Sequence, residues 1–317
     1  MAHYAFVFPG QGSQYVGMGK SLASASAAAA ETFNSADIVL DEPLSRLMFE
    51  GPAEQLDQTI NSQPAILAHS VALLRAIGGN TPAFYAGHSM GQYSAMVAAG
   101  VISLSDGLRL VRERGRQMQA SATDGAMAAI IGLPDDKVGA LETAGKTAGE
   151  FTIANRNSPG QIVVSGETAA VNHAAEAAKT MGAKRAIVLP VSVAAHSPLM
   201  ARAAEGMRKV LADVEFNDPA APLLSNAEAR PLTTAEECRD ELVEHLTRGV
   251  DWIAAVEYMT RQGVGSFVEV GPGKVLTGLI KRIAPEAQAV AVDDQSAPDG
   301  LAIPEFLTVT TTQGATA

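Results

Sequence analysis

The segment Gly87-His88-Ser89-Met90-Gly91 constrains the fold of this chain more than any other stretch of its sequence. It has the spacing G-x-S-x-G, follows the apolar residues 82–86 and precedes an Ala- and Met-rich segment at residues 94–99. A strand, a sharp turn and a helix are the context in which this pattern forms a nucleophile elbow, since the two glycines permit a strained turn. Ser89 would then be exposed at a helix N-terminus, with the Met90 amide free to bind an oxyanion. A plain glycine-rich turn is the alternative, because so short a motif also recurs by chance.

Composition limits the class of protein. The 317 residues are 47% hydrophobic and 18% charged, which is enough for a large core and more than one folding unit. No apolar run approaches the length of a membrane span and the N-terminus has no basic region, so we expect a chain that is not exported and lies in the cytoplasm. The single cysteine, Cys238, excludes an intrachain disulfide framework and suits a reducing compartment. The net charge of −11 argues against nucleic acid as a partner.

A second glycine-rich segment, residues 10–14, follows a short apolar run at residues 5–8 that is typical of a buried strand. It lacks the Gly-Lys-Ser/Thr of a P-loop, and Tyr15 stands where the dinucleotide pattern G-x-G-x-x-G requires its third glycine. A loop at a strand end can still present backbone amides, which makes Gln11 a candidate second oxyanion donor. A plain tight turn is equally compatible with this loop.

Residues 105–119 are predicted to form an amphipathic helix with Ser105 as its N-cap. Its apolar stripe consists of Leu108, Val111, Gly115 and Met118. Arg114 lies beside this stripe rather than on the solvated face, where Arg112 and Arg116 fall. An arginine in that place needs a carboxylate partner, because a buried unpaired charge is costly. A structural salt bridge would satisfy it, and so would a carboxylate that arrives with the substrate.

The chain from residue 124 to residue 191 differs in pattern from the segments around it. Strands are predicted at residues 126–133, 151–155, 161–165 and 185–191, and helices at residues 135–148 and 168–181. Their order, β-α-β-β-α-β, is that of a ferredoxin-like unit. We therefore expect a ferredoxin-like subdomain at residues 124–191, inserted into a large α/β domain of residues 1–123 and 192–290. Residues 291–317 contain few large apolar side chains and are expected to be a loosely held tail.

His196 is the best candidate for a base that activates Ser89. It precedes a helix start marked by Ser197 and Pro198, and a serine nucleophile needs a base within hydrogen-bond reach. Sequence distance does not establish that contact, and other histidines of the six occupy contexts typical of core or surface positions. No pair of histidines has metal-ligand spacing with a nearby carboxylate, so no metal is expected.

Six motifs in one order give the chain a resemblance to a known family. They are Phe8-Pro9-Gly10-Gln11-Gly12-Ser13-Gln14, Gly87-His88-Ser89-Met90-Gly91, Arg112-Glu113-Arg114-Gly115, Asn157-Ser158-Pro159-Gly160-Gln161, His196-Ser197-Pro198-Leu199-Met200 and Glu269-Val270-Gly271-Pro272-Gly273. With them the chain resembles the malonyl-CoA:acyl carrier protein transacylases of fatty acid synthesis, a family that includes the acyltransferase domains of polyketide synthases. The motifs span residues 4 to about 285 in the family's order, and together they are far more specific than any one of them.

The resemblance implies a fold and a mechanism. The fold is an α/β-hydrolase-like large domain around a mainly parallel sheet, interrupted by the ferredoxin-like subdomain. Ser89 would attack the thioester of malonyl-CoA while His196 takes its proton, and the malonyl ester would then pass to the phosphopantetheine thiol of acyl carrier protein. Arg114 would bind the malonyl carboxylate, and the amides of Gln11 and Met90 would bind the oxyanion.

The same resemblance implies the partners. The expected ones are malonyl-CoA and acyl carrier protein, with no cofactor, nucleic acid or membrane, and we expect a monomer. Because the family has no triad acid, a backbone carbonyl is expected to orient His196.

Three positions depart from the family pattern. Gln92 stands where Glu is usual after the elbow glycine, a change that is expected to be tolerated. His245 stands where bacterial members often carry Gln, and it is a candidate for orienting His196 or shaping the pocket. Ala195 is smaller than the residues that narrow the pocket against α-substituted malonyl groups, so methylmalonyl stays open beside malonyl.

Three other functions share much of this chemistry. A serine hydrolase or thioesterase would use Ser89 and His196, but it has no need of a cation such as Arg114 at the acyl terminus. An acyltransferase subunit of a malonate-processing complex and a trans-acting acyltransferase of polyketide synthesis stay open, since they differ in carrier rather than in chemistry. Cations that either steer an acidic carrier protein or form ordinary solvated surface are Lys184, Arg185, Arg202, Arg208, Lys209, Lys274, Lys281 and Arg282.

Overall fold

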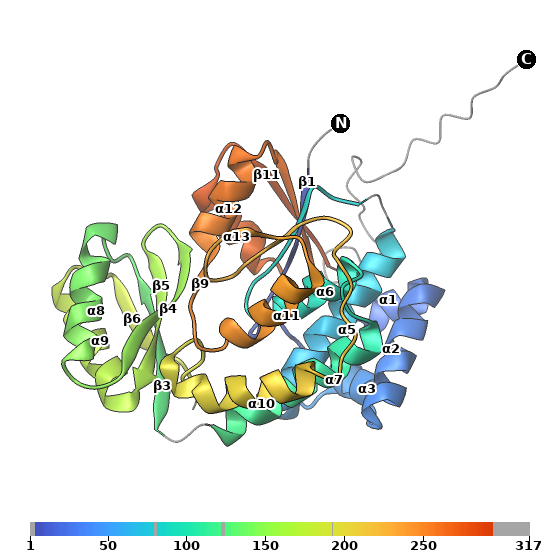
Figure 1. The fold of residues 1–317 in the computed structure, drawn as a ribbon, viewed down its shortest axis with the longest axis horizontal. Coiled ribbons are helices and arrows are strands. Elements are labelled where there is room, and N and C mark those ends of the chain that lie inside the picture. The colour runs from blue at the N-terminus through green and yellow to red at the C-terminus, as the bar shows by residue number, and fades with distance from the viewer. Residues whose placement is uncertain (1–3, 79–80, 122–123, 192, 294–317) are drawn as a thin grey trace, which may run out of the picture.

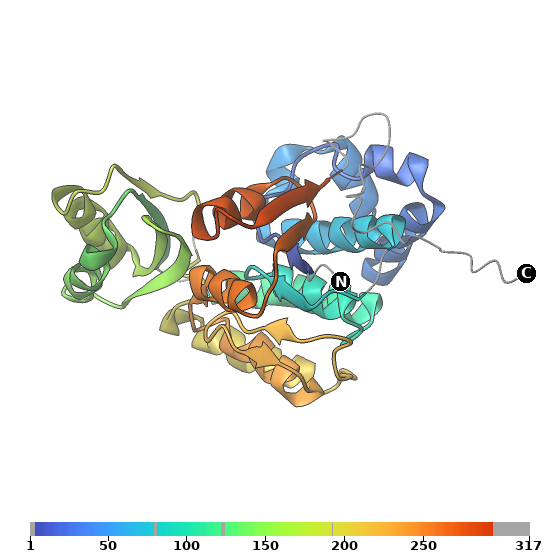
Figure 2. The same cartoon turned by 90° about the horizontal axis from the view of Figure 1, so that it is seen from above.

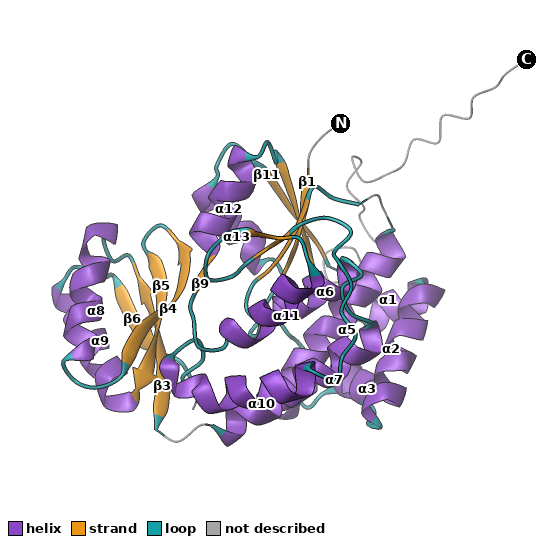
Figure 3. Ribbon diagram, viewed as in Figure 1, coloured by secondary structure: helices purple, strands orange, loops and turns teal. Residues whose placement is uncertain are grey.

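The computed structural model describes residues 4–78, 81–121, 124–191 and 193–293, and within them the chain is an α/β protein with two β-sheets. The larger sheet has six strands in the order β11-β10-β1-β2-β7-β8, and the smaller has five in the order β6-β3-β5-β4-β9. Figures 1 and 3 show the two sheets beside each other, each covered by helices. The α/β class expected from the sequence is confirmed.

The large sheet is mainly parallel. Its strands are β1 (Tyr4–Phe8), β2 (Phe84–Gly87), β7 (Leu223–Leu224), β8 (Pro231–Leu232), β10 (Ser266–Val270) and β11 (Gln288–Val292). Of its pairs only β7 with β8 is antiparallel. All five residues of β1, near the middle of the sheet, are buried. Burial on both faces is why this strand is an uninterrupted apolar run in the sequence.

Helices cover both faces of the large sheet. Because side chains alternate along a strand, Ala5 and Val7 of β1 pack with α12 (Trp252–Arg261) and α13 (Val275–Ile283). Phe6 and Phe8 belong to the opposite, larger core. The helices that contribute to that core are α1 (Lys20–Ala25), α2 (Ala27–Leu40), α3 (Leu44–Glu50), α4 (Ala53–Leu56), α5 (Thr59–Ile77), α6 (Gly91–Ala98), α7 (Leu104–Ala120), α10 (Ala201–Leu211) and α11 (Ala235–Glu244).

The small sheet is built mostly from one continuous segment. Its elements are β3 (Gly125–Ile131), the 3-10 helix η1 (Asp135–Lys137), α8 (Val138–Lys146), β4 (Phe151–Ser158), β5 (Gln161–Glu167), α9 (Thr168–Thr180) and β6 (Arg185–Val188). The pairs β3–β5, β3–β6 and β4–β5 are antiparallel, and α8 and α9 share a separate core with these strands. Figure 2 shows this unit at one end of the molecule and the layer of α1–α3 at the other.

A fifth strand joins the small sheet from elsewhere in the chain. This strand, β9 (Val250–Asp251), pairs in parallel with Asn155 and Arg156 of β4. The division into a unit of residues 1–123 and 192–290 and a unit of residues 124–191 therefore stays a prediction, since the small sheet also contains residues from outside the inserted segment.

Among the boundaries that differ from those expected are the start of α7 and the end of β6. The N-cap of α7 is Ser103, whose hydroxyl accepts a hydrogen bond from the Asp106 amide, so Ser105 lies inside the first turn. The last strand of the inserted segment, β6, ends at Val188 instead of residue 191.

The expected start of the tail at residue 291 is wrong. Residues 291 and 292 belong to β11, which pairs with β10 along its whole length, and Asp293 accepts a hydrogen bond from the Gly273 amide at 2.8 Å. Parallel pairing at the sheet edge thus extends the ordered fold to residue 293. The other residues of the expected tail, 294–317, lie outside the described residues. Within the described part of the chain, the helices are all too short or too polar to cross a bilayer.

Candidate active site

Ser89 occupies a strained turn between β2 and α6. Its φ is +54°, in the left-handed region that non-glycine residues rarely adopt. Only glycine fits on either side, because a Cβ at Gly87 would overlap the backbone of Gly91 and Gln92, and a Cβ at Gly91 would overlap the carbonyl oxygen of Phe8. The motif therefore forms the strand–turn–helix arrangement of a nucleophile elbow, with Ser89 just before the first turn of α6.

His196 lies within hydrogen-bond distance of Ser89. The Ser89 Oγ and the His196 Nε2 are 2.8 Å apart. On the other side of the ring, Nδ1 is 2.6 Å from the His245 carbonyl oxygen and 3.2 Å from the Arg248 carbonyl oxygen. Since carbonyl oxygens only accept, Nδ1 carries the proton of the neutral ring, which leaves the Nε2 lone pair to accept from the serine hydroxyl.

The surroundings of His196 keep its ring neutral. The residue is 3% exposed, and burial lowers its pKa from 6.5 to about 3, assisted by the nearby positive charge of Arg114. The backbone is also held, with φ at +61° and the amide donating to the Leu246 carbonyl at 3.1 Å. A neutral imidazole fixed at both nitrogens can take the serine proton, which is what a general base requires.

Arg114 reaches the same hydroxyl from α7. It is 2% exposed, and its Nη2 donates to Ser89 Oγ at 3.2 Å while Nη1 donates to the Gln63 carbonyl oxygen Oε1 at 2.9 Å. Its Nε has no hydrogen-bond partner, and no carboxylate within the described residues forms an ion pair with it. Burial lowers the pKa of this guanidinium. The structural salt bridge considered for this residue is thus not formed by the described residues.

The two loops expected to hold the oxyanion donors lie against each other. β1 pairs with β2 through Phe8 and Gly87, so the ends of both strands meet at one edge of the sheet. A Cβ at Gly10 would be 2.6 Å from the His88 carbonyl oxygen, which places the loop containing Gln11 against the elbow. The Gln11 side chain donates to Thr59 Oγ1 at 3.1 Å, outside the elbow.

Of the elbow amides, that of Ser89 is already used. It donates to the Asn226 side-chain oxygen Oδ1 at 2.9 Å. In the hydrogen bonds found among the described residues, the amides of Met90 and Gln11 are not donors. Met90 is the N-cap of α6, where the helix dipole also favours negative charge. Neither amide therefore has a partner among these bonds that would compete with an oxyanion.

The remaining candidates are His245, which contacts His196 through its backbone, and Ala195, which packs against the larger core. The His245 carbonyl contacts His196, whereas the His245 ring donates from Nδ1 to the Glu241 carbonyl oxygen at 2.9 Å and lies edge-on to Tyr93. Burial lowers the pKa of His245 well below 6.5. Ala195 is partly buried against the larger core.

Sequence reasoning missed two amide side chains in this site. Gln63 on α5 holds Arg114, and Asn226 holds the Ser89 amide and, through Nδ2, the Gly87 carbonyl oxygen at 3.1 Å. Asn226 lies two residues after the buried Leu223–Leu224 pair of β7, so a polar segment directly after an apolar strand was the available signal. For Gln63 the sequence shows only a polar residue inside an apolar helix.

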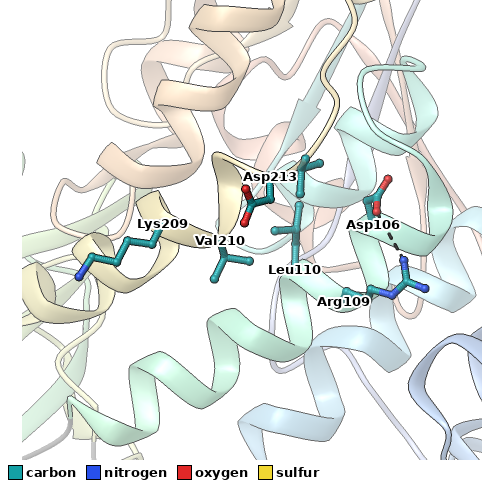
Figure 4. A pocket seen from close by; sticks show the side chains of 7 residues that line it. Asp106, Arg109, Leu110, Lys209, Val210 and Asp213 are labelled. Carbon is teal, nitrogen blue, oxygen red and sulfur yellow. Dashed lines mark ion pairs between the residues drawn. The ribbon is translucent and has the colours of Figure 1, made fainter.

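The elbow also contacts the small sheet. His88 donates from Nε2 to Asn157 Oδ1 at 2.9 Å, so a residue of β4 in the small sheet contacts the elbow. The described residues contain no group of three or more His, Cys, Asp or Glu side chains that could hold a metal. A separate surface cavity of about 430 Å³ lies between α7 and α10 (Figure 4). It is lined by Asp106, Arg109, Leu110, Lys209, Val210, Asp213 and Val214, and by none of the site residues.

Comparison with known proteins places this geometry in a family. Residues 5–311 match the acyl transferase domain. The malonyl CoA-acyl carrier protein transacylase of Escherichia coli O157:H7 is 47% identical and that of Bacillus subtilis strain 168 is 44% identical. These alignments cover 94% and 93% of this chain, and 98% and 94% of the relatives.

Solved structures agree with this assignment. An acyl carrier protein S-malonyltransferase from Vibrio cholerae superimposes with a TM-score of 0.89 at 44% identity, over 94% of this chain and 99% of that one. A malonyl-transacylase solved in complex with a type II polyketide synthase acyl carrier protein gives a TM-score of 0.89 at 43% identity, over 93% and 97%. With Ser89 in an elbow, His196 beside it and matches over nearly the whole length, this chain belongs to the acyl transferase family, among the malonyl-CoA–acyl carrier protein transacylases.

Proposed function

We propose that this chain transfers a malonyl group from malonyl-CoA to the phosphopantetheine thiol of an acyl carrier protein, through a malonyl ester on Ser89. The observation that carries the proposal is Arg114, a buried cation without a carboxylate partner among the described residues, 3.2 Å from the Ser89 hydroxyl. A guanidinium in such a place is satisfied by a carboxylate on the acyl group, since a bidentate pair matches its planar fork. Acyl groups without a terminal carboxylate would leave this charge unpaired.

In the first half-reaction the serine becomes acylated. Ser89 Oγ attacks the thioester carbonyl carbon as its proton passes to His196 Nε2, and the carbonyl oxygen becomes an oxyanion next to the amides of Met90 and Gln11. The tetrahedral intermediate collapses as the C–S bond breaks. The proton on His196 goes to the departing thiolate of coenzyme A, so the ring returns to its neutral form.

The second half-reaction reverses these roles. The carrier's thiol gives its proton to His196 and attacks the ester carbon, and the C–O bond to Ser89 then breaks while His196 returns the proton to Oγ. Because the first product leaves before the second substrate reacts, the proposal predicts ping-pong kinetics. The carbonyl oxygens of His245 and Arg248 would stabilise the imidazolium in both steps, which replaces the acid of a catalytic triad.

The carrier is proposed to dock through exposed cations. Lys274 and Lys281 lie at the two ends of α13, and Arg282 donates to Gln161 of β5, so this group lies where the two sheets meet. By contrast, Arg208 and Lys209 both pair with Glu205. Free positive charge near the junction would attract an acidic carrier despite the net charge of −11. We further propose a cytoplasmic monomer whose reaction needs no cofactor.

Intact-mass measurement after incubation with acyl-CoA tests the function. Malonyl-CoA is expected to add one malonyl group to the wild type and nothing to Ser89→Ala. Methylmalonyl-CoA loading with equal yield would shift the assignment toward supply of polyketide synthesis, which the small Ala195 leaves open. Acetyl-CoA loading equal to malonyl-CoA loading, or release of free malonate with no adduct, would reject the transferase in favour of a hydrolase.

A further inference from the structure

The nucleophile and the base are both anchored to the last turn of α11. From this helix, Glu241 reaches the nucleophile's side of the site, where its Oε1 accepts from the Asn226 amide at 2.7 Å. The carbonyl of the same residue accepts from the His245 amide at 3.0 Å and from the His245 ring at 2.9 Å. The His245 carbonyl in turn accepts from His196. One turn of helix therefore fixes the supports of both reacting side chains.

Asn226 uses each of its hydrogen-bonding groups in this arrangement. Its Oδ1 accepts from the Ser89 amide at 2.9 Å, and its Nδ2 donates to the Gly87 carbonyl at 3.1 Å. Its amide donates to Glu241, and its carbonyl accepts from the Asp251 amide at 2.7 Å. Asn226 is 3% exposed, so no solvent replaces a lost bond. Only a side chain with one acceptor and one donor satisfies both ends of the elbow, and an amide has both.

The elbow needs this support because of its backbone. A left-handed φ at serine is unfavourable, since Cβ crowds the following carbonyl oxygen. The Asn226 side chain bridges the residues before and at this strained position, from Gly87 to Ser89. Without it the turn would relax, and Ser89 Oγ would move from its 2.8 Å contact with His196.

Glu241 is a buried carboxylic group that the proposed chemistry does not use. It is 6% exposed, and the nearby side chains of Ser225 and Asn226 partly offset the rise that burial causes in its pKa. None of the ion pairs within the described residues includes it. A buried acid whose side chain bonds to the Ser225–Asn226 segment serves to fix that segment.

We propose that Asn226 and Glu241 are positioning residues for the nucleophile: Asn226 holds Ser89 in its left-handed conformation, and Glu241 holds Asn226. In many serine enzymes a buried acid orients the base; here the acid acts on the serine's backbone and leaves the base to carbonyl oxygens. This inference deepens the proposed function, because it concerns the same serine.

The proposal is tested by two reaction rates, each measured per folded protein molecule. The first is malonyl loading from malonyl-CoA, with kcat and KM separated. The second is phosphorylation of Ser89 by diisopropyl fluorophosphate, in which Oγ forms the P–O bond, fluoride leaves and the proton passes to His196. The second reagent has no carboxylate, so it reports nucleophile placement independently of the acyl substrate.

Four variants and two controls give the comparison. Asn226→Ala, Asn226→Asp and Glu241→Ala are expected to lower kcat and the fluorophosphate rate by about 100-fold, with KM changed less than about twofold, as for a reacting atom displaced by about 1 Å. Glu241→Gln keeps an acceptor for the Asn226 amide and is expected to stay near wild type. Controls are Asn155→Ala, another buried asparagine, and Glu269→Gln, another buried carboxylic group, which accepts the Leu276 and Thr277 amides of α13.

The outcomes separate this inference from the proposed function. Wild-type protein that reacts with the fluorophosphate but takes no malonyl group would reject the function, while the fluorophosphate rates of the variants still decide the positioning role. If Asn226→Ala, Asn226→Asp and Glu241→Ala react as fast as the controls, the inference is overturned. So would loss of folding in both Asn226→Ala and Glu241→Ala, since the two residues would then support the fold as a whole.

Discussion

Replacing Arg114 by leucine is expected to change which acyl group Ser89 accepts. The guanidinium is the cation that contacts the nucleophile, and it is almost fully buried between Gln63 and Ser89. Leucine fills similar space on the apolar side of α7 without a charge. A malonyl carboxylate would then enter a buried site with no partner, whereas an acetyl group would meet an apolar surface.

The magnitude follows from this burial. Removing one partner of a buried charge pair costs about 3–5 kcal/mol, because the remaining charge is left without water or a counter-ion. At about 1.4 kcal/mol per tenfold, kcat/KM for malonyl-CoA is expected to fall by about 10²- to 10⁴-fold. For acetyl-CoA it is expected to stay the same or rise, so selectivity for malonyl is lost.

Intact-mass time courses with malonyl-CoA and acetyl-CoA measure both rates. Arg116→Ala is the matched control, because Arg116 is on the same helix but is exposed and pairs with Glu113. The free energy of unfolding of Arg114→Leu is expected to stay the same or rise, since the fold no longer contains this unpaired charge. A parallel fall in malonyl and acetyl loading, or no fall in either, would refute the role of Arg114 in selecting the carboxylate.

The same variant gives a prediction for pH. Burial first, and the Arg114 charge second, lower the pKa of His196 to about 3. A base with so low a pKa stays unprotonated at mildly acidic pH. Protonation of His196 is therefore not expected to lower the wild-type acylation rate in that range. Removing Arg114 removes one cause of the lowered pKa. The pKa of His196 is then expected to rise toward 6.5, and the acetyl-loading rate of Arg114→Leu to begin falling at higher pH than in the wild type.

Three further predictions concern stability, docking and reactivity. Gly91→Ala is expected to lower the free energy of unfolding by about 1–3 kcal/mol or more, because the new Cβ meets the backbone of Phe8. Gly139→Ala in α8, where nothing lies within 4 Å, should instead raise it by about 0.5–1 kcal/mol; thermal unfolding of both decides. The double variant Lys274→Glu, Lys281→Glu should raise KM for carrier protein at low salt and leave malonyl loading from malonyl-CoA unchanged. Lys146→Glu on α8 is the control. An unchanged KM for carrier protein would contradict the proposal that these lysines form the docking surface. Burial raises the pKa of the Cys238 thiol to about 12, so iodoacetamide should leave the folded protein unmodified at about pH 8, and rapid alkylation would contradict this burial.

Much of the fold follows from local sequence patterns. The uninterrupted apolar run of β1 indicates a strand buried on both faces, and the alternating elements of residues 124–191 predict most strands of the small sheet. Boundaries were less predictable. Both Ser103 and Ser105 can cap a helix, and the hydrogen bond to the Asp106 amide decides between them. At the other end, the weakly apolar residues 288–292 become a strand because β10 offers them a parallel edge.

For the candidate site too, the sequence predicts some features and the tertiary structure decides others. Within the elbow, Gly87 and Gly91 mark the turn in the sequence, but the overlap that excludes a Cβ at Gly91 involves Phe8 of β1 and is decided by the tertiary structure. The sequence also marks Arg114 as unusual, since helical periodicity alone places it beside an apolar stripe. It cannot show that His196, 107 residues after Ser89, lies 2.8 Å from it, nor that Asn226, 137 residues away, holds its amide. The Asn226 contact arises when β7 pairs with β2, because pairing brings together strand ends whose separation along the chain carries no distance information. The His196 contact arises when the segment after α11 holds His196 through the carbonyl oxygens of residues 245, 246 and 248.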